Sequence, residues 1–303
     1  MRGVIIKSTG SWYLVRDEQD KVVRARLPGK FKLNDQKISN PISVGDFVIL
    51  EAEDDNFLIQ KILQRRNYII RKSPKKRGYA HMIAANIDQA VMVASHKRPR
   101  TSLGFIDRFF TTLEAFRIPG FLLINKADLY SEAELTALRE IMKMYEKIGY
   151  RAAITSFTEN NISEIDGWFE NKITLISGHS GAGKSTLINL IAPKATQAVG
   201  EISDFANKGT HTTTFAEMFS LNPTTHIIDT PGIKELGLAE IQTAELSHYF
   251  PEMRNFLGQC KFHNCLHISE PSCAIQEAVK SGEIALSRFE SYLSMMENDD
   301  NRR

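Results

Sequence analysis

The stretch Gly178-His179-Ser180-Gly181-Ala182-Gly183-Lys184-Ser185 decides how the middle of this chain folds. It fits the pattern G-x-x-x-x-G-K-[ST], in which the backbone N–H groups of a glycine-rich loop surround phosphate oxygens. An apolar run at 173–177 precedes it and predicts a buried strand, and a helical pattern at 185–191 follows it. Strand, glycine loop and helix are the context that this motif requires. We therefore expect a phosphate site with Lys184 on the β- and γ-phosphates and Ser185 as a ligand of Mg²⁺.

The whole chain has the composition of an ordinary globular protein. It contains 303 residues with a net charge of +2 and 42% hydrophobic residues, which allows two or three domains. No apolar run approaches the roughly 18 residues of a membrane helix, and the apolar run at the start is too short for a signal peptide. The three cysteines cluster late in the chain, which indicates a metal site in a reducing compartment. These features predict a cytoplasmic protein that does not contact a membrane.

Short strands separated by turn residues are predicted for the first 65 residues. The candidate strands are 4–6, 12–15, 22–26, 47–50 and 57–62. Five short strands favour a small closed barrel, of which the OB-fold is one type, and such barrels often bind oligonucleotides. Residues 1–78 contain 17 Lys and Arg against 9 Asp and Glu, whereas the remainder contains 21 against 27. This basic part indicates a polyanionic partner such as nucleic acid, with a solvated basic surface as an equal alternative.

From residue 86 onward, predicted strands alternate with predicted helices, which is typical of a parallel sheet. The expected strands are 90–95, 121–124, 152–155, 173–177, 215–221 and 226–229, and the expected helices are 103–117, 132–148, 162–170 and 185–191. Further helices are expected at 240–250, 275–280 and 284–297. The basic stretch 66–80 is predicted to be a link in which Ser73-Pro74 and Gly78 break regular structure, with a domain boundary near residue 72.

Asn125-Lys126-Ala127-Asp128 fits N-K-x-D, the guanine-reading motif of GTPases, and follows the expected strand 121–124. The Asp128 carboxylate can accept hydrogen bonds from guanine N1–H and N2–H₂ together, whereas adenine would leave that charge desolvated and unpaired. Lys126 can lie along the base plane, and Asn125 can brace the loop. Thr155-Ser156 stands where a last, weak base-contacting loop is expected.

A fourth motif, Asp229-Thr-Pro-Gly232, fits D-x-x-G. We expect Asp229 in the magnesium shell and the Gly232 N–H on the γ-phosphate. Together these motifs predict the nucleotide-binding residues Asn125, Lys126, Ala127, Asp128, Thr155, Ser156, Gly178, His179, Ser180, Gly181, Ala182, Gly183, Lys184, Ser185, Thr186, Asp229 and Gly232.

The catalytic group is less evident. Many GTPases carry a Gln after D-x-x-G that orients the attacking water, but here the position is Ile233. Another group must place the water, and His211 is the nearest polar candidate, with a surface histidine as the competing interpretation. One threonine of the stretch 209–214 is expected to complete the magnesium shell, with Thr213 as a candidate. The expected catalytic residues are therefore His211, Lys184 and Thr213.

The order of the motifs is unusual, because the base-reading motif at 125–128 precedes the phosphate loop at 178–185. In ordinary GTPases the phosphate loop comes first. The same sheet closes if the chain is circularly permuted, and permutation is physically easy because the termini of compact domains often lie close together. We therefore predict a circularly permuted phosphate-loop GTPase domain.

Every cysteine of the chain lies in one short segment, Cys260-x4-Cys265-x-His267-x5-Cys273. Three thiolates and one imidazole form a closed tetrahedral Zn²⁺ site of structural character. Three buried cysteines beside a surface histidine are the alternative. His263 also lies in this segment and is interpreted as a bystander. A small segment with few large apolar residues would gain much of its folding free energy from the metal.

This motif order, with its flanking domains, resembles the RsgA (YjeQ) family of circularly permuted GTPases that act in maturation of the small ribosomal subunit. The resemblance covers nearly the whole chain. Matching stretches are 85–89, 106–108, 125–128, 178–185, 211–214 and 229–232. The chain departs from the family at Thr155-Ser156, where Ser-Ala is usual, and at Thr210, where a basic residue is usual.

The resemblance implies three domains: an OB-fold barrel at 1–72, a circularly permuted α/β GTPase domain at 73–237 and a helical zinc-binding domain at 238–303. It implies an enzyme that hydrolyses GTP to GDP and phosphate with Mg²⁺, holds one structural Zn²⁺ and acts late in assembly of the small ribosomal subunit. The expected partners are GTP, GDP, the small subunit and its rRNA, and a monomer is expected. The alternative is a GTP-dependent RNA-binding switch without a role in ribosome assembly.

Overall fold

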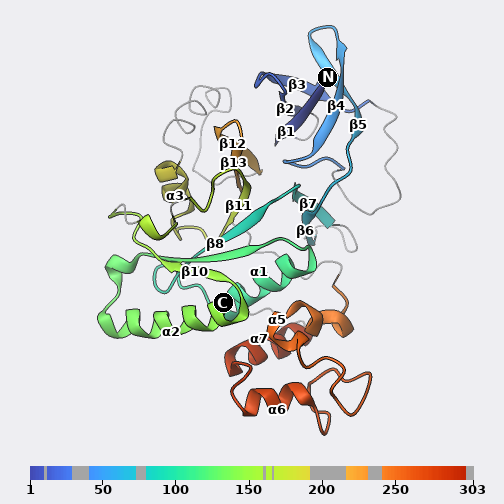
Figure 1. The fold of residues 1–303 in the computed structure, drawn as a ribbon. Coiled ribbons are helices and arrows are strands. Elements are labelled where there is room, and N and C mark those ends of the chain that lie inside the picture. The colour runs from blue at the N-terminus through green and yellow to red at the C-terminus, as the bar shows by residue number, and fades with distance from the viewer. Residues whose placement is uncertain are drawn as a thin grey trace.

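The computed structural model describes residues 1–9, 12–28, 41–72, 80–159, 162–165, 167–191, 216–230 and 241–297. Its main sheet contains eleven strands in the order β10-β9-β8-β11-β13-β12-β1-β2-β3-β5-β4. The first six strands belong to a central α/β layer and the last five to an N-terminal barrel. The barrel lies at one end of the molecule and a helical C-terminal part at the other (Figure 1).

The barrel consists of β1 (Arg2–Ser8), β2 (Tyr13–Asp17), β3 (Val22–Arg26), β4 (Phe47–Glu53) and β5 (Asn56–Ile62). Pairing between β1 and β4 closes it. Alternate residues of β3 are buried, because successive side chains of a strand point to opposite faces. Tyr13 is buried in the barrel core, whereas Trp12 is 39% exposed. The predicted OB-type barrel is thus confirmed.

A two-stranded hairpin joins the barrel to the central layer. It pairs β6 (Tyr68–Lys72) with β7 (Ala80–Ala85). The sequence predicts a basic link at 66–80, and the described part of that stretch belongs mainly to this hairpin, whereas the breaks predicted at Ser73-Pro74 and Gly78 lie outside the described residues. The β-branched and aromatic run Tyr68-Ile-Ile and the apolar stretch near residue 82 are the strand signals, which the neighbouring basic residues concealed. Ile69 and Ile70 are fully buried on opposite faces of the hairpin.

The central layer is a parallel sheet with one antiparallel edge strand. Its strands are β8 (Gln89–Ser95), β9 (Gly120–Asn125), β10 (Arg151–Ile154), β11 (Ile173–Ser177), β12 (Glu217–Asn222) and β13 (Thr225–Asp229), and only β12 runs antiparallel to its neighbour β13. All residues of β8 are buried, as expected for a parallel strand that is covered on both faces.

Helices cover both faces of this sheet (Figure 1). They are α1 (Leu103–Ala115), α2 (Glu132–Ile148) and α3 (Lys184–Ile191), and the short 3₁₀ turns are η1 (Ala127–Leu129) and η2 (Ser163–Ile165). Met92 packs in the core cluster of α1 and α2, whereas its neighbours Val91 and Val93 pack in the cluster of α3. Ser131 and Glu134 form a capping box at the start of α2, which satisfies two of the free N–H groups there.

The C-terminal part contains η3 (Thr243–Tyr249), α5 (Pro251–Arg254), α6 (Ala274–Lys280) and α7 (Leu286–Met296). The sequence predicts one helix at 240–250, but the described residues there form a 3₁₀ segment that ends before Pro251. Proline forces the preceding residue away from helical angles, and Phe250 has φ −108° and ψ 102°.

The helix predicted at 162–170 was also wrong. Only η2 and turns are found among its described residues. Gly167 has φ +73°, a left-handed conformation that interrupts a helix. Trp168 and Phe169 are buried against the α3 side of the sheet.

A buried ionic cluster attaches the C-terminal part to the central layer. The Arg288 guanidinium in α7 is fully buried, and its Nη1 lies 2.6 Å from Asp107 Oδ1 in α1. Its Nε lies 2.7 Å from Glu252 Oε1 in α5. Asp107 Oδ1 also accepts from the Tyr145 hydroxyl at 2.6 Å, and the Arg288 guanidinium lies 4.7 Å from the centre of the Phe250 ring. Four elements, α1 and α2 of the central layer and α5 and α7 of the C-terminal part, therefore meet at one buried charged cluster.

Among the described residues, no helix has both the length and the apolar character needed to cross a membrane.

Candidate nucleotide and metal sites

The predicted phosphate loop connects β11 to α3, at the carboxyl edge of the parallel strands. Two of its glycines cannot be replaced without displacing neighbouring atoms. Gly178 has φ +146°, and a Cβ there would lie 2.1 Å from the Val93 carbonyl oxygen. Gly183 has φ +110°, and a Cβ there would lie 2.2 Å from Asn125 Nδ2. The loop therefore packs closely against β8 and β9 at positions where only a glycine, without a side chain, fits.

Lys184 lies folded over this loop. Its ammonium group donates to the carbonyl oxygens of Gly178 at 3.0 Å and His179 at 3.1 Å. Burial lowers the pKa of Lys184, and the nearby Asp229 carboxylate partly opposes that shift. A cation held over a ring of backbone groups is an arrangement that can receive phosphate oxygens. Ser185 and Thr186, at the start of α3, are both exposed.

The base-reading loop is attached to the phosphate loop through Asn125. Asn125 Nδ2 donates to the Ala182 carbonyl at 2.9 Å, and Asn125 Oδ1 accepts from the Phe157 N–H at 3.1 Å. The side chain is buried, so one amide ties together the predicted base loop, the phosphate loop and the loop after β10. These three segments are far apart in the sequence and meet at one sheet edge.

Asp128 and Lys126 extend from the same loop. The Ser156 hydroxyl donates to Asp128 Oδ1 at 2.6 Å, and the Thr155 carbonyl accepts from the Ala127 N–H at 3.0 Å. Lys126 has a left-handed backbone conformation, and its ammonium donates to the Arg98 carbonyl. The dipeptide 155–156 thus contacts the base-reading loop directly, through one side chain and one backbone group.

Asp229 ends β13 beside the phosphate loop. Its Oδ1 is buried without a hydrogen-bond partner among the described residues. Burial raises the pKa of Asp229 to about 6; Lys184 opposes this shift and Glu217 reinforces it. A buried, unpaired carboxylate oxygen next to a phosphate loop fits a hard divalent cation that needs oxygen ligands. The residues present are therefore compatible with Mg²⁺, held by Asp229 and Ser185.

The four predicted zinc ligands come together in the C-terminal part. The ligand atoms of Cys260, Cys265, His267 and Cys273 lie within 4.8 Å of one another. His267 Nδ1 is 3.5 Å from Cys260 Sγ and 3.4 Å from Cys273 Sγ. Burial raises the pKa of the Cys265 thiol to about 12 and lowers that of His267. A buried cation would reverse the shift of the thiol, and a neutral imidazole can ligate, so the group fits Zn²⁺.

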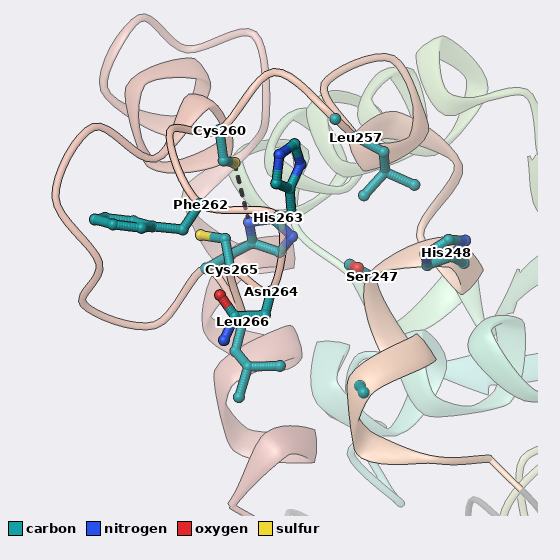
Figure 2. A pocket seen from close by; sticks show the side chains of 12 residues that line it. Ser247, His248, Leu257, Cys260, Phe262, His263, Asn264, Cys265 and Leu266 are labelled. Atoms are coloured by element: carbon teal, nitrogen blue, oxygen red, sulfur yellow. Dashed lines mark hydrogen bonds between the residues drawn. The ribbon is translucent and has the colours of Figure 1, made fainter.

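Neighbouring groups fix the loop that carries these ligands. The Glu270 carboxylate accepts from the backbone N–H groups of Leu266, Ile268 and Ser269 at 2.7–3.0 Å. The Tyr292 hydroxyl of α7 donates to the Leu266 carbonyl at 2.7 Å. A cavity of about 520 Å³ opens beside the cluster, between this loop and the η3 segment that carries Ser247 and His248 (Figure 2). His263 lines that cavity rather than joining the ligand group.

Part of the predicted site lies outside the described residues. This applies to His211, Thr213, Gly232 and Ile233. Conversely, two contacts of the site are not predicted from the sequence. The Phe105 ring of α1 stacks on His179 of the phosphate loop with centroids 4.1 Å apart, and Lys126 contacts the Arg98 backbone. Neither has a sequence signal, since one depends on helix docking and the other on a carbonyl group that every residue has.

Comparison with known proteins agrees with this geometry. The sequence model of the RsgA GTPase matches residues 62–239, and that of the RsgA N-terminal domain matches residues 2–57. The chain belongs to the RsgA GTPase family. RsgA relatives named small ribosomal subunit biogenesis GTPase include one from Cytophaga hutchinsonii, 51% identical over 100% of both chains. Another, from Phocaeicola vulgatus, is 43% identical over 99% of this chain and 97% of its own.

Solved structures of RsgA relatives share the whole fold. YjeQ from Thermotoga maritima has a TM-score of 0.78 and 32% identity, covering 100% of this chain and 99% of its own. YloQ, described as a circularly permuted GTPase, has a TM-score of 0.73 and 31% identity, covering 100% and 96%. The predicted combination of OB-type barrel, permuted GTPase domain and C-terminal metal-binding helices is thereby confirmed for this RsgA family member.

Proposed function

We propose that this chain hydrolyses GTP to GDP and phosphate as an assembly factor of the small ribosomal subunit. The observation that carries the proposal is the Asn125 amide, which holds the base-reading loop against the phosphate loop. Joined in this way, the base-reading loop and the phosphate loop can bind the base and the phosphates of the same guanine nucleotide. The printed names of full-length relatives support the ribosomal role.

In this proposal each part of the site has a separate task. Asp128, oriented by the Ser156 hydroxyl, reads guanine N1–H and N2–H₂. Lys184 leaves its carbonyl partners to hold the β- and γ-phosphates. Ser185 and Asp229 hold Mg²⁺, which when bound neutralises the charge that builds up on the phosphate oxygens. The remaining phosphate-loop residues, His179 and Thr186 included, contact phosphate through the backbone or the helix start.

Placement of the attacking water falls to the segment outside the described residues. His211 remains our candidate for that task and Thr213 for the magnesium shell. Because Ile233 cannot orient water, we expect slow turnover by the isolated chain and faster turnover when small subunits help to place the water.

The finer assignments belong to the same proposal. The domains are 1–72, 73–237 and 238–303. Zn²⁺ is the metal of the C-terminal cluster and is structural, because four N and S ligands leave no open position. The barrel, with exposed Trp12 and its basic charge, contacts rRNA by stacking and phosphate pairing. The chain acts as a monomer in the cytoplasm, where its subunit partner is assembled.

The test is steady-state phosphate release with and without small subunits. We expect strong stimulation for the wild type and loss of most of it in His211→Ala with unchanged GTP affinity. Full stimulation of the alanine variant would remove His211 from the mechanism. Unchanged wild-type turnover on adding subunits would reject the coupling.

Sedimentation separates the main proposal from its alternative. With a non-hydrolysable GTP analogue, cofractionation with small subunits is expected, and cofractionation only with other RNA would favour a GTP-dependent RNA-binding switch without an assembly role. The relatives' names do not favour that alternative.

A further inference from the structure

Three charged residues form a row across three neighbouring strands. Lys7 of β1 is directly opposite Glu217 of β12, and Glu217 is directly opposite Asp229 of β13. Both pairings are antiparallel, so the three side chains project from the same face of the sheet. The row starts in the barrel and ends at the carboxylate that we assign to the magnesium shell.

Each of the two carboxylates in this row has a cation beside it. Lys7 Nζ lies 2.9 Å from Glu217 Oε2, with the two side chains only 29% and 22% exposed. At the other end, Lys184 acts electrostatically on Asp229. The two carboxylates are thus adjacent in the middle, each with a cation on its outer side. Like charges directly opposite each other on a sheet are unfavourable, so each cation stabilises the row.

Removal of the Lys7 charge would leave Glu217 uncompensated close to the phosphate loop. The bound nucleotide is itself an anion, and a GTP complex carries one more negative charge than the corresponding GDP complex. An uncompensated Glu217 would therefore repel GTP more than GDP. Because Lys7 belongs to the barrel, the barrel would take part in distinguishing the two nucleotides.

We propose that Lys7 is a positioning residue of the phosphate site: it neutralises Glu217 and so permits the site beside Asp229 to accept the γ-phosphate. The inference rests on the proposed function, since it concerns the same nucleotide. It assigns Lys7 an electrostatic role that is distinct from holding the barrel in place.

Other contacts already hold the barrel against the central layer. Arg16 of β2 donates to the Ser220 hydroxyl of β12. Asn86 Nδ2, which is buried, donates to the Gly45 carbonyl at 2.9 Å, and Val44 pairs with Ala84. Loss of the Lys7–Glu217 pair therefore leaves the barrel attached, and a change in nucleotide preference can be measured separately from a loss of fold.

The experiment is equilibrium binding of GDP and of a non-hydrolysable GTP analogue to the full chain in the presence of Mg²⁺. Lys7→Met is expected to weaken the analogue relative to GDP by roughly five- to tenfold, the effect of one uncompensated charge in a partly buried site near the protein surface. Lys7→Arg, which keeps the charge, is expected to retain the wild-type ratio. Lys61→Met is the matched control, an exposed barrel lysine on β5.

The double variant Lys7→Met/Glu217→Gln provides the decisive measurement. It removes both charges, so the affinity ratio is expected to return to within about twofold of wild type. If the Lys7–Glu217 ion pair only held the barrel in place, the double variant would remain impaired, because it also lacks that ion pair. Two results would overturn this inference but leave the proposed function intact. One is an unchanged affinity ratio in Lys7→Met, and the other is an equal loss of affinity for both nucleotides that the double variant does not restore. A wild-type chain that binds neither nucleotide overturns the proposed function and the inference with it.

Discussion

Replacement of Arg288 by Met would test how the C-terminal part is held on the central layer. The guanidinium is completely buried and contacts Asp107 and Glu252, whose side chains are 1% and 9% exposed. Although burial opposes the charge, these two carboxylates hold the pKa of Arg288 well above its ordinary value. The variant keeps much of the apolar volume but leaves two buried carboxylates without their shared cation.

The expected cost follows from that geometry. Breaking a buried ion pair by removing one partner destabilises by about 3–5 kcal/mol. Asp107 retains the Tyr145 hydroxyl, which places the expected value at the lower end, about 3 kcal/mol. Arg254→Met is the matched control, because Arg254 pairs with Glu114 across the same two domains but is 45% exposed. An exposed pair contributes about 0–1 kcal/mol.

Native-state hydrogen exchange of the α7 amides is the assay. About 3 kcal/mol corresponds to a loss of roughly two orders of magnitude in protection, and α1 is expected to lose protection on its α7-facing side. Changing Asp107 and Glu252 to their amides in the Arg288→Met background would restore part of the loss, since no charge is then buried. Equal protection in Arg288→Met and Arg254→Met would refute the view that this cluster holds the domains together.

Three further predictions concern separate parts of the molecule. GTP and GDP are expected to bind at least about a hundredfold more tightly than ATP, and equal binding of ATP and GTP would contradict this. Asp128→Asn is expected to shift the preference toward xanthine nucleotides, with Glu132→Gln as the exposed control. Metal analysis is expected to find one Zn²⁺ per chain, and chelation or Cys265→Ser is expected to unfold the C-terminal part while nucleotide binding remains. The Lys97 ammonium and the Ser131 N–H hold the pKa of Glu134 at about 2. The stabilisation from this capping contact is therefore complete above the ordinary carboxyl range and is lost progressively as the pH falls from that range to about 2, where an NMR titration would show the carboxyl accepting its proton.

The parts of the fold that follow local patterns could be predicted from the sequence. The helix at Glu132–Ile148 has the predicted bounds. Residues that form a capping box precede and begin it and Gly149 follows it, and both are local signals that can be recognised in the sequence. The strand Ile173–Ser177 is also as predicted, because a short apolar run next to a phosphate motif has few other interpretations. The metal cluster was predictable because all cysteines of the chain lie in it.

Features that depend on tertiary contacts could not be predicted. The hairpin β6–β7 was concealed because β6 ends in Arg71 and Lys72 and more basic residues follow it in the sequence, and charge is a signal of surface rather than of loop. The Asp107–Arg288 cluster joins residues 181 positions apart, and an isolated Asp or Arg in an amphipathic helix is ordinarily solvated. The row of Lys7, Glu217 and Asp229 depends on strand register, which sequence periodicity alone does not determine across two domains.

Pairing of β1 with β12 also determines whether another molecule can add a strand to this edge of the central sheet. The edge of a sheet is a template for a further strand, and many partners bind by adding one. Here part of the β12 edge is already taken by the chain's own barrel, which behaves as a permanently tethered ligand. Because tethering gives such a ligand a high effective concentration, the β1–β12 pairing and the few other contacts of the barrel with its neighbours are enough to hold it there. A competing strand in solution would have to overcome that advantage before it could bind there.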